Sequence, residues 1–320
     1  MGWQLDNEPE AKEDYSPGSQ QAFRSWLEKK YQSIDALNMA WGAAFWSQTY
    51  SDFDQIKIPN ANLVGWWGTN PHALLDFKRY ASDTQADFLD FQVSILRPLI
   101  SKNQFITTNY TATTQVADPR RTKKLDFNSF TSYPNKGNPN LGDKGFRLGD
   151  PKELSFAFGF FKLQNNISGV MELQPGYVNW GSINPLLHPG ALRMWLYNCF
   201  GADLSFACSY RYRQINYSAE QYHGGITKLD GITLSQGGKD YQQVIQEMKV
   251  LRKAYNPQAI LPAELAGRKT AILWNYDNLW SMDRQGQTNQ WNTRSFIQKY
   301  LEIARSFGAP TDIIYEEDEL

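Results

Sequence analysis

The chain has 320 residues, room for one large domain or two ordinary ones, and its 41% hydrophobic and 20% charged content is typical of a globular protein. A net charge of −1 without a basic stripe argues against a nucleic-acid partner, and no window approaches the roughly 20 apolar residues of a membrane span. The two cysteines, Cys199 and Cys208, lie in apolar runs and the three histidines are scattered, so we expect buried free thiols, no metal site and no cofactor.

The chain opens on a strand with a polar end. Trp3–Leu5 is predicted to be a short buried strand, and it runs directly into Asp6-Asn7-Glu8. A strand end with an acid and an amide is typical of a functional site, and proteins rarely begin with such a segment. We therefore expect Met1 to be internal to a longer natural protein.

Helices are predicted over most of the next eighty residues. Helical periodicity begins at Gln20, and Ser33 is the expected N-cap of a second helix that ends at Gly42. Residues 43–67 are aromatic and irregular, and a long helix is predicted over 72–99. Its apolar side is predicted to carry Leu75, Phe77, Phe88, Phe91 and Ile95.

Short apolar strands then alternate with helices, a pattern that predicts a parallel sheet covered by helices. The strands are predicted over 104–109, 125–130, 168–172 and 204–209, and the helices over 151–163, 189–201 and 240–255. The strand ends carry polar or aromatic residues: Glu8, Asn109, Tyr133, Glu172 and Tyr210. Active sites of (β/α)8 barrels lie at that end of the strands, and no Gly-rich phosphate loop follows any of them, which disfavours a nucleotide-binding sheet.

The pattern changes after Pro257. A linker precedes a strand over 269–274, a helix over 294–307 and a strand over 311–315, which together read as the start of a second α/β domain. One βαβ unit is too small to bury a core by itself, so we expect this domain to be truncated.

Glu8 and Glu172 stand out because each lies at the C-terminal end of a predicted parallel strand. Two carboxyl groups that flank one bond are what glycoside hydrolysis needs, since one protonates the leaving oxygen and the other attacks the anomeric carbon or activates water. The alternative is that each is an ordinary strand-end glutamate that caps the following helix. The two residues by themselves leave both interpretations open.

Other polar and aromatic residues fit a sugar site. Asn7 places an amide beside Glu8, and Glu220 with His223 offers an acceptor and a donor for vicinal hydroxyl groups. Alternatively, Glu220 and His223 lie in a surface loop and the histidine has no functional role. Trp180 is either a platform for a sugar ring or a core residue.

Several longer blocks occur in a recognisable order. They are Trp3-Gln-Leu-Asp-Asn-Glu8, Phe23–Tyr31 with Ser33–Gly42, Ala44–Tyr50, Met171–Gly176 with Val178-Asn-Trp180, and Glu220–His223. In these blocks the chain resembles glycoside hydrolase family 42, the β-galactosidases, from about residue 2 to residue 240.

The resemblance implies a (β/α)8 barrel followed by a flavodoxin-like α/β domain that builds a trimer interface. It also implies hydrolysis of terminal β-D-galactosides with retention by double displacement, with Glu8 as general acid/base and Glu172 as nucleophile. The implied sugar-contacting residues are Asn7, Tyr133, Trp180, Tyr210, Glu220 and His223. Family members often carry Phe where this chain has Tyr210, and Trp46 is a candidate to reach a neighbouring subunit's site.

The chain also departs from the family pattern. The stretch after Glu8 lacks the cysteine cluster that holds zinc in some members, so we expect no zinc there. In the family the Asn-Glu motif ends the fourth barrel strand, so the chain would contain strands 4 to 8 only. We divide it into a partial barrel over 1–256, a linker over 257–268 and a truncated domain over 269–320. Without strands 1–3 we expect this chain alone to be poorly active.

Three alternatives stay open at this point. The enzyme could act on β-fucosides or α-L-arabinopyranosides, which differ from galactosides mainly at C5, or the chain could be an inactive fragment or sugar-binding remnant. The resemblance implies a galactoside substrate and a homotrimer at full length. Whether the protein is cytoplasmic or periplasmic is not decided by these residues.

Overall fold

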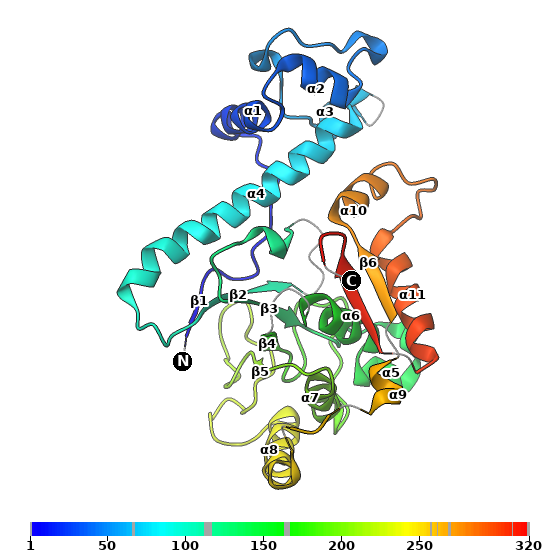
Figure 1. Cartoon of the computed structure of the whole chain (residues 1–320). Coiled ribbons are helices and arrows are strands. Elements are labelled where there is room, and N and C mark those ends of the chain that lie inside the picture. Colours follow the sequence, from blue (N-terminus) through cyan, green and yellow to red (C-terminus); the bar gives the residue numbers. More distant parts are fainter. Residues whose placement is uncertain are drawn as a thin grey trace.

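Five parallel strands form the centre of the molecule (Figure 1). This is a computed structural model, and it describes residues 2–65, 68–111, 117–162, 167–256, 258–260, 262–267, 270–308 and 310–318. The strands are β1 (Trp3–Gln4), β2 (Ile106–Thr111), β3 (Phe127–Ser132), β4 (Gly169–Leu173) and β5 (Phe206–Ser209), and they pair in the order β1-β2-β3-β4-β5. Parallel neighbours that follow the chain order, with helical crossovers, are the pattern of a (β/α)8 barrel. The predicted partial barrel is confirmed.

Helices cover the outer face of these strands. They are α4 (Pro71–Leu96), α6 (Pro151–Lys162), α7 (Ala191–Gly201) and α8 (Gln236–Ala254). Phe130 of β3 is completely buried and stacks on Phe161 of α6 with ring centroids 4.9 Å apart. Trp195 of α7 is 1% exposed, and its indole N–H donates to the Leu148 carbonyl. Burial of such large side chains against the sheet is the main source of stability for this half-barrel.

Several short helices lie in the connections. They are the helices α3 (Ala61–Val64), α5 (Gly142–Leu148) and α9 (Ala263–Ala266), and the 3-10 helices Phe45–Ser47, Phe53–Gln55, Arg97–Leu99, Pro119–Arg121 and Pro139–Leu141. Trp66 and Trp67, which fall in the predicted irregular loop, lie outside the described residues. Among the described residues no helix is both long and apolar enough to cross a bilayer.

Two helices pack on the first half of α4 and form a helical subdomain, residues 17–58 with 71–80, at the top of Figure 1. They are α1 (Pro17–Tyr31) and α2 (Ile34–Trp41). The predicted cap is confirmed, since the Ser33 side chain accepts a hydrogen bond from the Ala36 N–H. Gly42 ends α2 with a φ of 60°, a left-handed conformation that glycine adopts without steric cost. This subdomain has its own core, centred on Phe23, Leu27, Leu37, Trp41, Phe77 and Tyr80.

The C-terminal segment forms a two-stranded parallel sheet that packs on the barrel. It contains β6 (Thr270–Trp274), α10 (Tyr276–Met282), α11 (Thr293–Ser306) and β7 (Thr311–Tyr315). Its aromatic side chains meet those of α6 in one continuous core: Phe156, Phe160, Trp274, Tyr276 and Tyr315. The predicted βαβ start is present, and α10 is an addition to it. The unit is stable here because α6 supplies the apolar surface that two strands lack.

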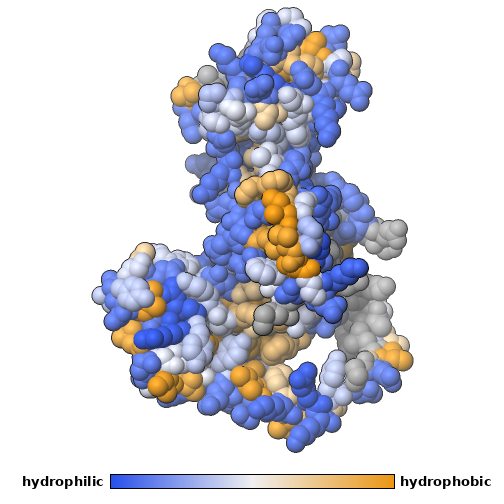
Figure 2. All heavy atoms as spheres, turned by 90° about the vertical axis from the view of Figure 1, so that its left-hand side faces the viewer, coloured by the Kyte–Doolittle hydropathy of each residue, from blue (hydrophilic) through white to orange (hydrophobic). Residues whose placement is uncertain are grey.

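One face of α4 differs from the prediction. Phe77 is buried, but Phe88, Phe91 and Ile95 of the predicted apolar side are 52%, 59% and 52% exposed, so the described residues cover only part of that side. Leu89 and Val93 face the sheet instead. Two apolar stripes run along this half of the helix, and the periodicity does not tell which one is covered. Figure 2, which looks onto the left-hand side of Figure 1, shows an apolar strip on the face that includes this end of α4.

The exposed stripe predicts self-association of the 320-residue chain, because a contiguous apolar patch favours contacts that exclude water. We expect Phe91→Lys with Ile95→Lys to lower the apparent mass of the chain in light scattering. Gln21→Lys with Ser25→Lys is the control, since these exposed polar residues of α1 are also four positions apart and the change adds the same two positive charges. An equal effect of the control would mean that net charge, and not the stripe, governs association.

Two further predictions about burial were wrong. Trp3 is 46% exposed because β1 lies at the edge of the sheet, where only β2 pairs with it among the described strands. Cys199 is buried, as expected, but Cys208 is exposed although it lies in the apolar run of β5. β5 is the other edge of the sheet among the described strands, so its side chains have a neighbouring strand on one side only.

Candidate active site

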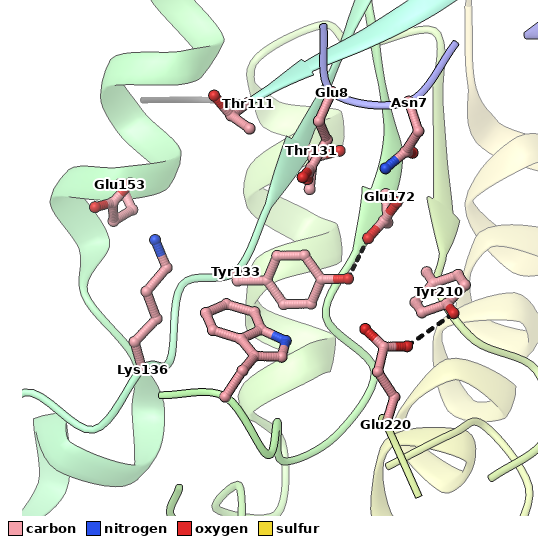
Figure 3. A pocket seen from close by; sticks show the side chains of 11 residues that line it. Asn7, Glu8, Thr111, Thr131, Tyr133, Lys136, Glu153, Glu172, Tyr210 and Glu220 are labelled. Atoms are coloured by element: carbon pink, nitrogen blue, oxygen red, sulfur yellow. Dashed lines mark hydrogen bonds between the residues drawn. The ribbon is translucent and has the colours of Figure 1, made fainter. Parts of the chain in front are cut away.

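A cavity of about 480 Å³ opens where the carboxyl ends of the barrel strands meet (Figure 3). It is lined by Asn7, Glu8, Thr111, Thr131, Tyr133, Lys136, Glu153, Glu172, Trp180, Tyr210 and Glu220. All of the predicted site residues except His223 are in this set. They come from segments up to two hundred residues apart, and the parallel strands bring them to one rim.

Glu8 enters the cavity from the turn that follows β1. Both Asp6 and Glu8 have a φ of 48°, a left-handed conformation that is costly for residues with a side chain. Burial raises the pKa of Glu8 above the ordinary glutamate value, as do the charges of Glu10 and Glu220, while a hydrogen bond from Thr131 opposes the rise. A raised pKa keeps a carboxyl group protonated closer to neutral pH, which is what a general acid requires.

Glu172 lies on β4 and points toward the same space as Glu8 (Figure 3). The Tyr133 hydroxyl donates a hydrogen bond to its carboxylate. Burial raises the pKa of Glu172, and the charges of Glu8 and Glu220 add to that rise. The Tyr133 hydrogen bond and the positive charge of Arg211 oppose it, because both favour the ionised carboxylate. Glu172 is therefore a buried carboxyl group whose ionised form is favoured by a tyrosine donor and a nearby arginine.

A second polar group closes the opposite side of the cavity. The Tyr210 hydroxyl donates to Glu220 at 2.9 Å, and Arg211 forms an ion pair with the same carboxylate. The Arg211 guanidinium also stacks on the Tyr210 ring, 4.5 Å from its centroid. These contacts fix the direction of the Glu220 carboxylate, so it can accept hydrogen bonds from a ligand without reorganising.

His223 does not line the cavity. It is completely buried, and its ring packs edge-on against Tyr133 and Tyr210 with centroids 5.8 Å and 5.5 Å away. Burial lowers its pKa, which favours the neutral imidazole. Its role as a sugar contact stays a prediction, and in this arrangement it supports the two tyrosines from behind.

Two predicted aromatic residues are exposed. Trp180 is 47% exposed at the mouth of the cavity, with its ring 5.0 Å from that of Tyr133 in an edge arrangement. One face of such an indole is available for a flat ligand. Trp46 is 65% exposed in the helical subdomain, outside the residues that line the cavity. Its proposed contact with another subunit is therefore neither supported nor contradicted.

Sequence reasoning missed several residues of this site. Thr111, Thr131, Lys136 and Glu153 line the cavity, and Arg211 holds Glu220. Thr111 and Thr131 lie at the carboxyl ends of β2 and β3, so their position next to predicted strand ends could have indicated the site. Lys136 and Glu153 lie in a loop and a helix, and nothing in their local pattern distinguishes them from surface charges.

The Tyr133 hydrogen bond predicts a shift in pH dependence. Replacing Tyr133 by Phe removes a donor that favours ionised Glu172, so the pKa of Glu172 should rise further. If ionised Glu172 is required, the acid limb of kcat/KM moves to higher pH, and kcat/KM above that limb falls roughly tenfold. Tyr110→Phe is the control, since Tyr110 is buried on β2 and bonds Thr122 instead. An unchanged acid limb in Tyr133→Phe would contradict this assignment.

Comparison with known families gives two matches. A model described as β-galactosidase, glycoside hydrolase family 42, covers residues 1–251, and one described as the β-galactosidase trimerisation domain covers residues 268–320. The β-galactosidase of Thermus thermophilus is 32% identical over 324 residues, which is 98% of this chain and 48% of that protein.

Solved structures agree with these matches. The β-galactosidase from the psychrophilic Marinomonas ef1 is 30% identical with a TM-score of 0.87, over 99% of this chain and 50% of that one. The enzyme from the Antarctic haloarchaeon Halorubrum lacusprofundi is 26% identical with a TM-score of 0.88, over 100% of this chain and 47% of that one. The chain thus spans about half the length of the relatives it matches.

Proposed function

Because the chain belongs to glycoside hydrolase family 42, we propose that the complete protein is a β-galactosidase whose two catalytic carboxyl groups both lie in this chain. The main observation behind the proposal is that Glu8, from the turn after β1, and Glu172, from β4, line the same cavity. Burial raises the pKa of both carboxyl groups; Glu172 accepts a hydrogen bond from Tyr133 with Arg211 nearby, and Glu8 accepts one from Thr131 with Lys136 nearby.

We propose a double displacement with retention at the anomeric carbon. The Glu172 carboxylate attacks C1 of the galactosyl group while the Glu8 carboxyl donates its proton to the glycosidic oxygen, and the C1–O bond to the aglycone breaks. Glu8, now ionised, then takes a proton from a water molecule that attacks C1. The bond to Glu172 breaks, β-galactose leaves, and Glu8 is protonated again.

The sugar-contacting roles are proposed for the remaining rim residues. Glu220, held by Arg211, would accept hydrogen bonds from vicinal hydroxyl groups, and the Asn7 amide faces the cavity beside the acid/base. Trp180 would provide the flat face on which a sugar ring stacks. Tyr210 would form part of the wall, where its hydroxyl group also orients Glu220.

The assembly and domain roles are also proposals. The C-terminal segment matches the trimerisation model, which supports a homotrimer for the complete protein. We retain the division into barrel (1–256), linker (257–268) and trimerisation domain (269–320). A trimer would bring surface residues such as Trp46 near another subunit.

Hydrolysis of nitrophenyl glycosides by the complete enzyme tests the function. We expect p-nitrophenyl β-D-galactoside to have the highest kcat/KM in a panel that includes the β-D-fucoside and the α-L-arabinopyranoside. A higher kcat/KM for either of the latter two substrates would leave the proposed mechanism intact but would change the sugar that we propose as substrate. No turnover of any member by the complete enzyme would contradict the proposal.

We expect the 320-residue chain alone to show little turnover. Five strands surround the cavity where a closed barrel has eight, so part of the cavity wall is absent among the described residues. The assay is p-nitrophenyl β-D-galactoside hydrolysis by the purified chain, with Glu172→Gln as the background control. Turnover close to that of the complete enzyme, and abolished by Glu172→Gln, would show that the five strands suffice.

A further inference from the structure

Asn109 connects the two halves of the site, and the proposed reaction assigns it no role. It is the fourth residue of β2 and has no exposed surface. Its strand lies between β1, which leads to Glu8, and β3, whose other neighbour β4 carries Glu172. An asparagine amide has two donor hydrogens and one acceptor oxygen, and in Asn109 both ends are used toward the residues of the site.

The oxygen of Asn109 holds the turn after β1. It accepts hydrogen bonds from the Gln4 side chain at 2.7 Å and from the Glu8 backbone N–H at 3.3 Å. These two donors lie on either side of the turn in which Asp6 and Glu8 have a φ of 48°. A conformation of this kind persists only where surrounding contacts hold it, and Asn109 supplies two of them.

The nitrogen of Asn109 reaches the side chains around the cavity. It donates to Thr131 Oγ1 at 2.7 Å and to Asn7 Oδ1 at 3.1 Å, and it lies 3.5 Å from Glu172 Oε2. Because this nitrogen can only donate, Thr131 Oγ1 must accept from it. The Thr131 hydrogen is then left to donate to the Glu8 carboxyl group, with which Thr131 is hydrogen-bonded.

We propose that Asn109 is the positioning residue that holds the acid/base turn and the nucleophile at the spacing that double displacement needs. The inference rests on the proposed function. A buried asparagine with a purely structural role would bond mainly to backbone groups. Four of the five partners of Asn109 are side chains, and three of those, on Asn7, Thr131 and Glu172, line the cavity.

Asn109→Asp in the complete enzyme tests the proposal, since it keeps the shape and replaces the donor nitrogen by an acceptor. We expect kcat to fall about 10²-fold, with a smaller change in KM, because misplacing reacting groups affects the chemical step while Asn109 itself is buried away from the sugar. The acid limb of kcat/KM should move to higher pH, because an added negative charge near Glu172 disfavours its ionised form.

Asn128→Asp is the matched control. Asn128 is a buried asparagine on the adjacent strand, and its amide donates to the Pro119 carbonyl, outside the cavity lining. Rates of all variants are divided by the concentration of active sites, titrated with a 2-deoxy-2-fluoro-galactoside that traps the glycosyl-enzyme. If Asn109→Asp does not fold, Asn109→Ser, which keeps one donor, is measured in the same way.

The outcomes separate the two proposals. A normal kcat per active site and an unmoved acid limb in a folded Asn109 variant would overturn the positioning role and leave the β-galactosidase assignment intact. Failure of the unsubstituted enzyme to hydrolyse any galactoside would instead contradict the proposed β-galactosidase function. A lower kcat with a shifted acid limb in the Asn109 variants, absent in Asn128→Asp, supports the inference.

Discussion

Removal of the Glu172 carboxylate should abolish hydrolysis and leave an enzyme that azide can rescue with inversion. In Glu172→Gly we expect kcat of the complete enzyme to fall on the order of 10⁴-fold or more, because the covalent intermediate cannot form. The vacated space admits azide, which attacks C1 on the face where the carboxylate lay. Since only one displacement then occurs, the product should be α-galactosyl azide.

The Glu8→Gly variant should behave differently. Loss of the general acid costs about 10²–10⁴-fold with a poorly activated aglycone. A dinitrophenyl galactoside needs no protonation on leaving, so its glycosylation step should be far less affected. Azide would then replace water in the second displacement, and the product should be β-galactosyl azide.

NMR of the two azide products decides the roles. Opposite anomers from the two variants, as stated, would support Glu172 as nucleophile and Glu8 as acid/base. The reverse pairing would exchange the roles, and failure of azide to rescue either variant would argue against double displacement. Glu28→Gln is the control, since Glu28 is an exposed carboxylate on α1 outside the cavity lining and should retain activity close to that of the unsubstituted enzyme.

Replacing Asp76 by Asn should destabilise the helical subdomain more than any surface change. Asp76 lies on α4 with no exposed surface. It accepts hydrogen bonds from Tyr31 at 2.6 Å and Trp41 at 2.9 Å, and it pairs with Lys30 and Arg79. Loss of the charge leaves two cations together without their shared anion, and breaking a buried ion pair costs about 3–5 kcal/mol.

The same residue gives a pH dependence. Burial by itself would raise the pKa of Asp76, but hydrogen bonds from Lys30, Tyr31 and Trp41 and the Lys30 charge hold that pKa below the ordinary value. A lowered pKa in the folded state means that the stabilisation is present above the ordinary aspartate pKa, and is lost as pH falls through the lowered value. Asp76→Asn should therefore weaken the acid sensitivity of the subdomain.

Urea unfolding followed by circular dichroism at neutral and acid pH measures both effects. Asp87→Asn is the control, because Asp87 is an exposed carboxylate on the same helix, and such changes usually stay within about 0.5 kcal/mol. If the urea midpoint of unfolding of Asp76→Asn equals that of Asp87→Asn, the hydrogen bonds and ion pairs of Asp76 contribute nothing to stability. Arg79 also pairs with Asp277 of α10, so the effect should extend to the contact with the C-terminal segment.

Local sequence patterns predicted which strands and helices are present better than they predicted the first and last residues of each. The strand over 311–315 was predicted at its observed bounds, whereas the strands over 104–109 and 125–130 begin two residues later, at Ile106 and Phe127. Apolar runs indicate that a strand is present, but its first residue depends on where hydrogen bonding to the neighbouring strand begins. The helix predicted from 240 begins at Gln236, after the Ser235 cap that the pattern did not single out.

The sequence alone determined that Glu8 and Glu172 lie at or just after the carboxyl ends of parallel strands, because an apolar run that ends in a polar residue is a local property and parallel strands share one rim. Only the tertiary structure decided that Phe88, Phe91 and Ile95 face outward, that His223 lies behind two tyrosines, and that Asn109 joins the Glu8 turn to Glu172. Burial and hydrogen bonding depend on partners that are distant in the chain: Glu8 lies 101 residues from Asn109, and Glu172 lies 63. No local pattern contains such pairs, because they exist only once the strands have assembled.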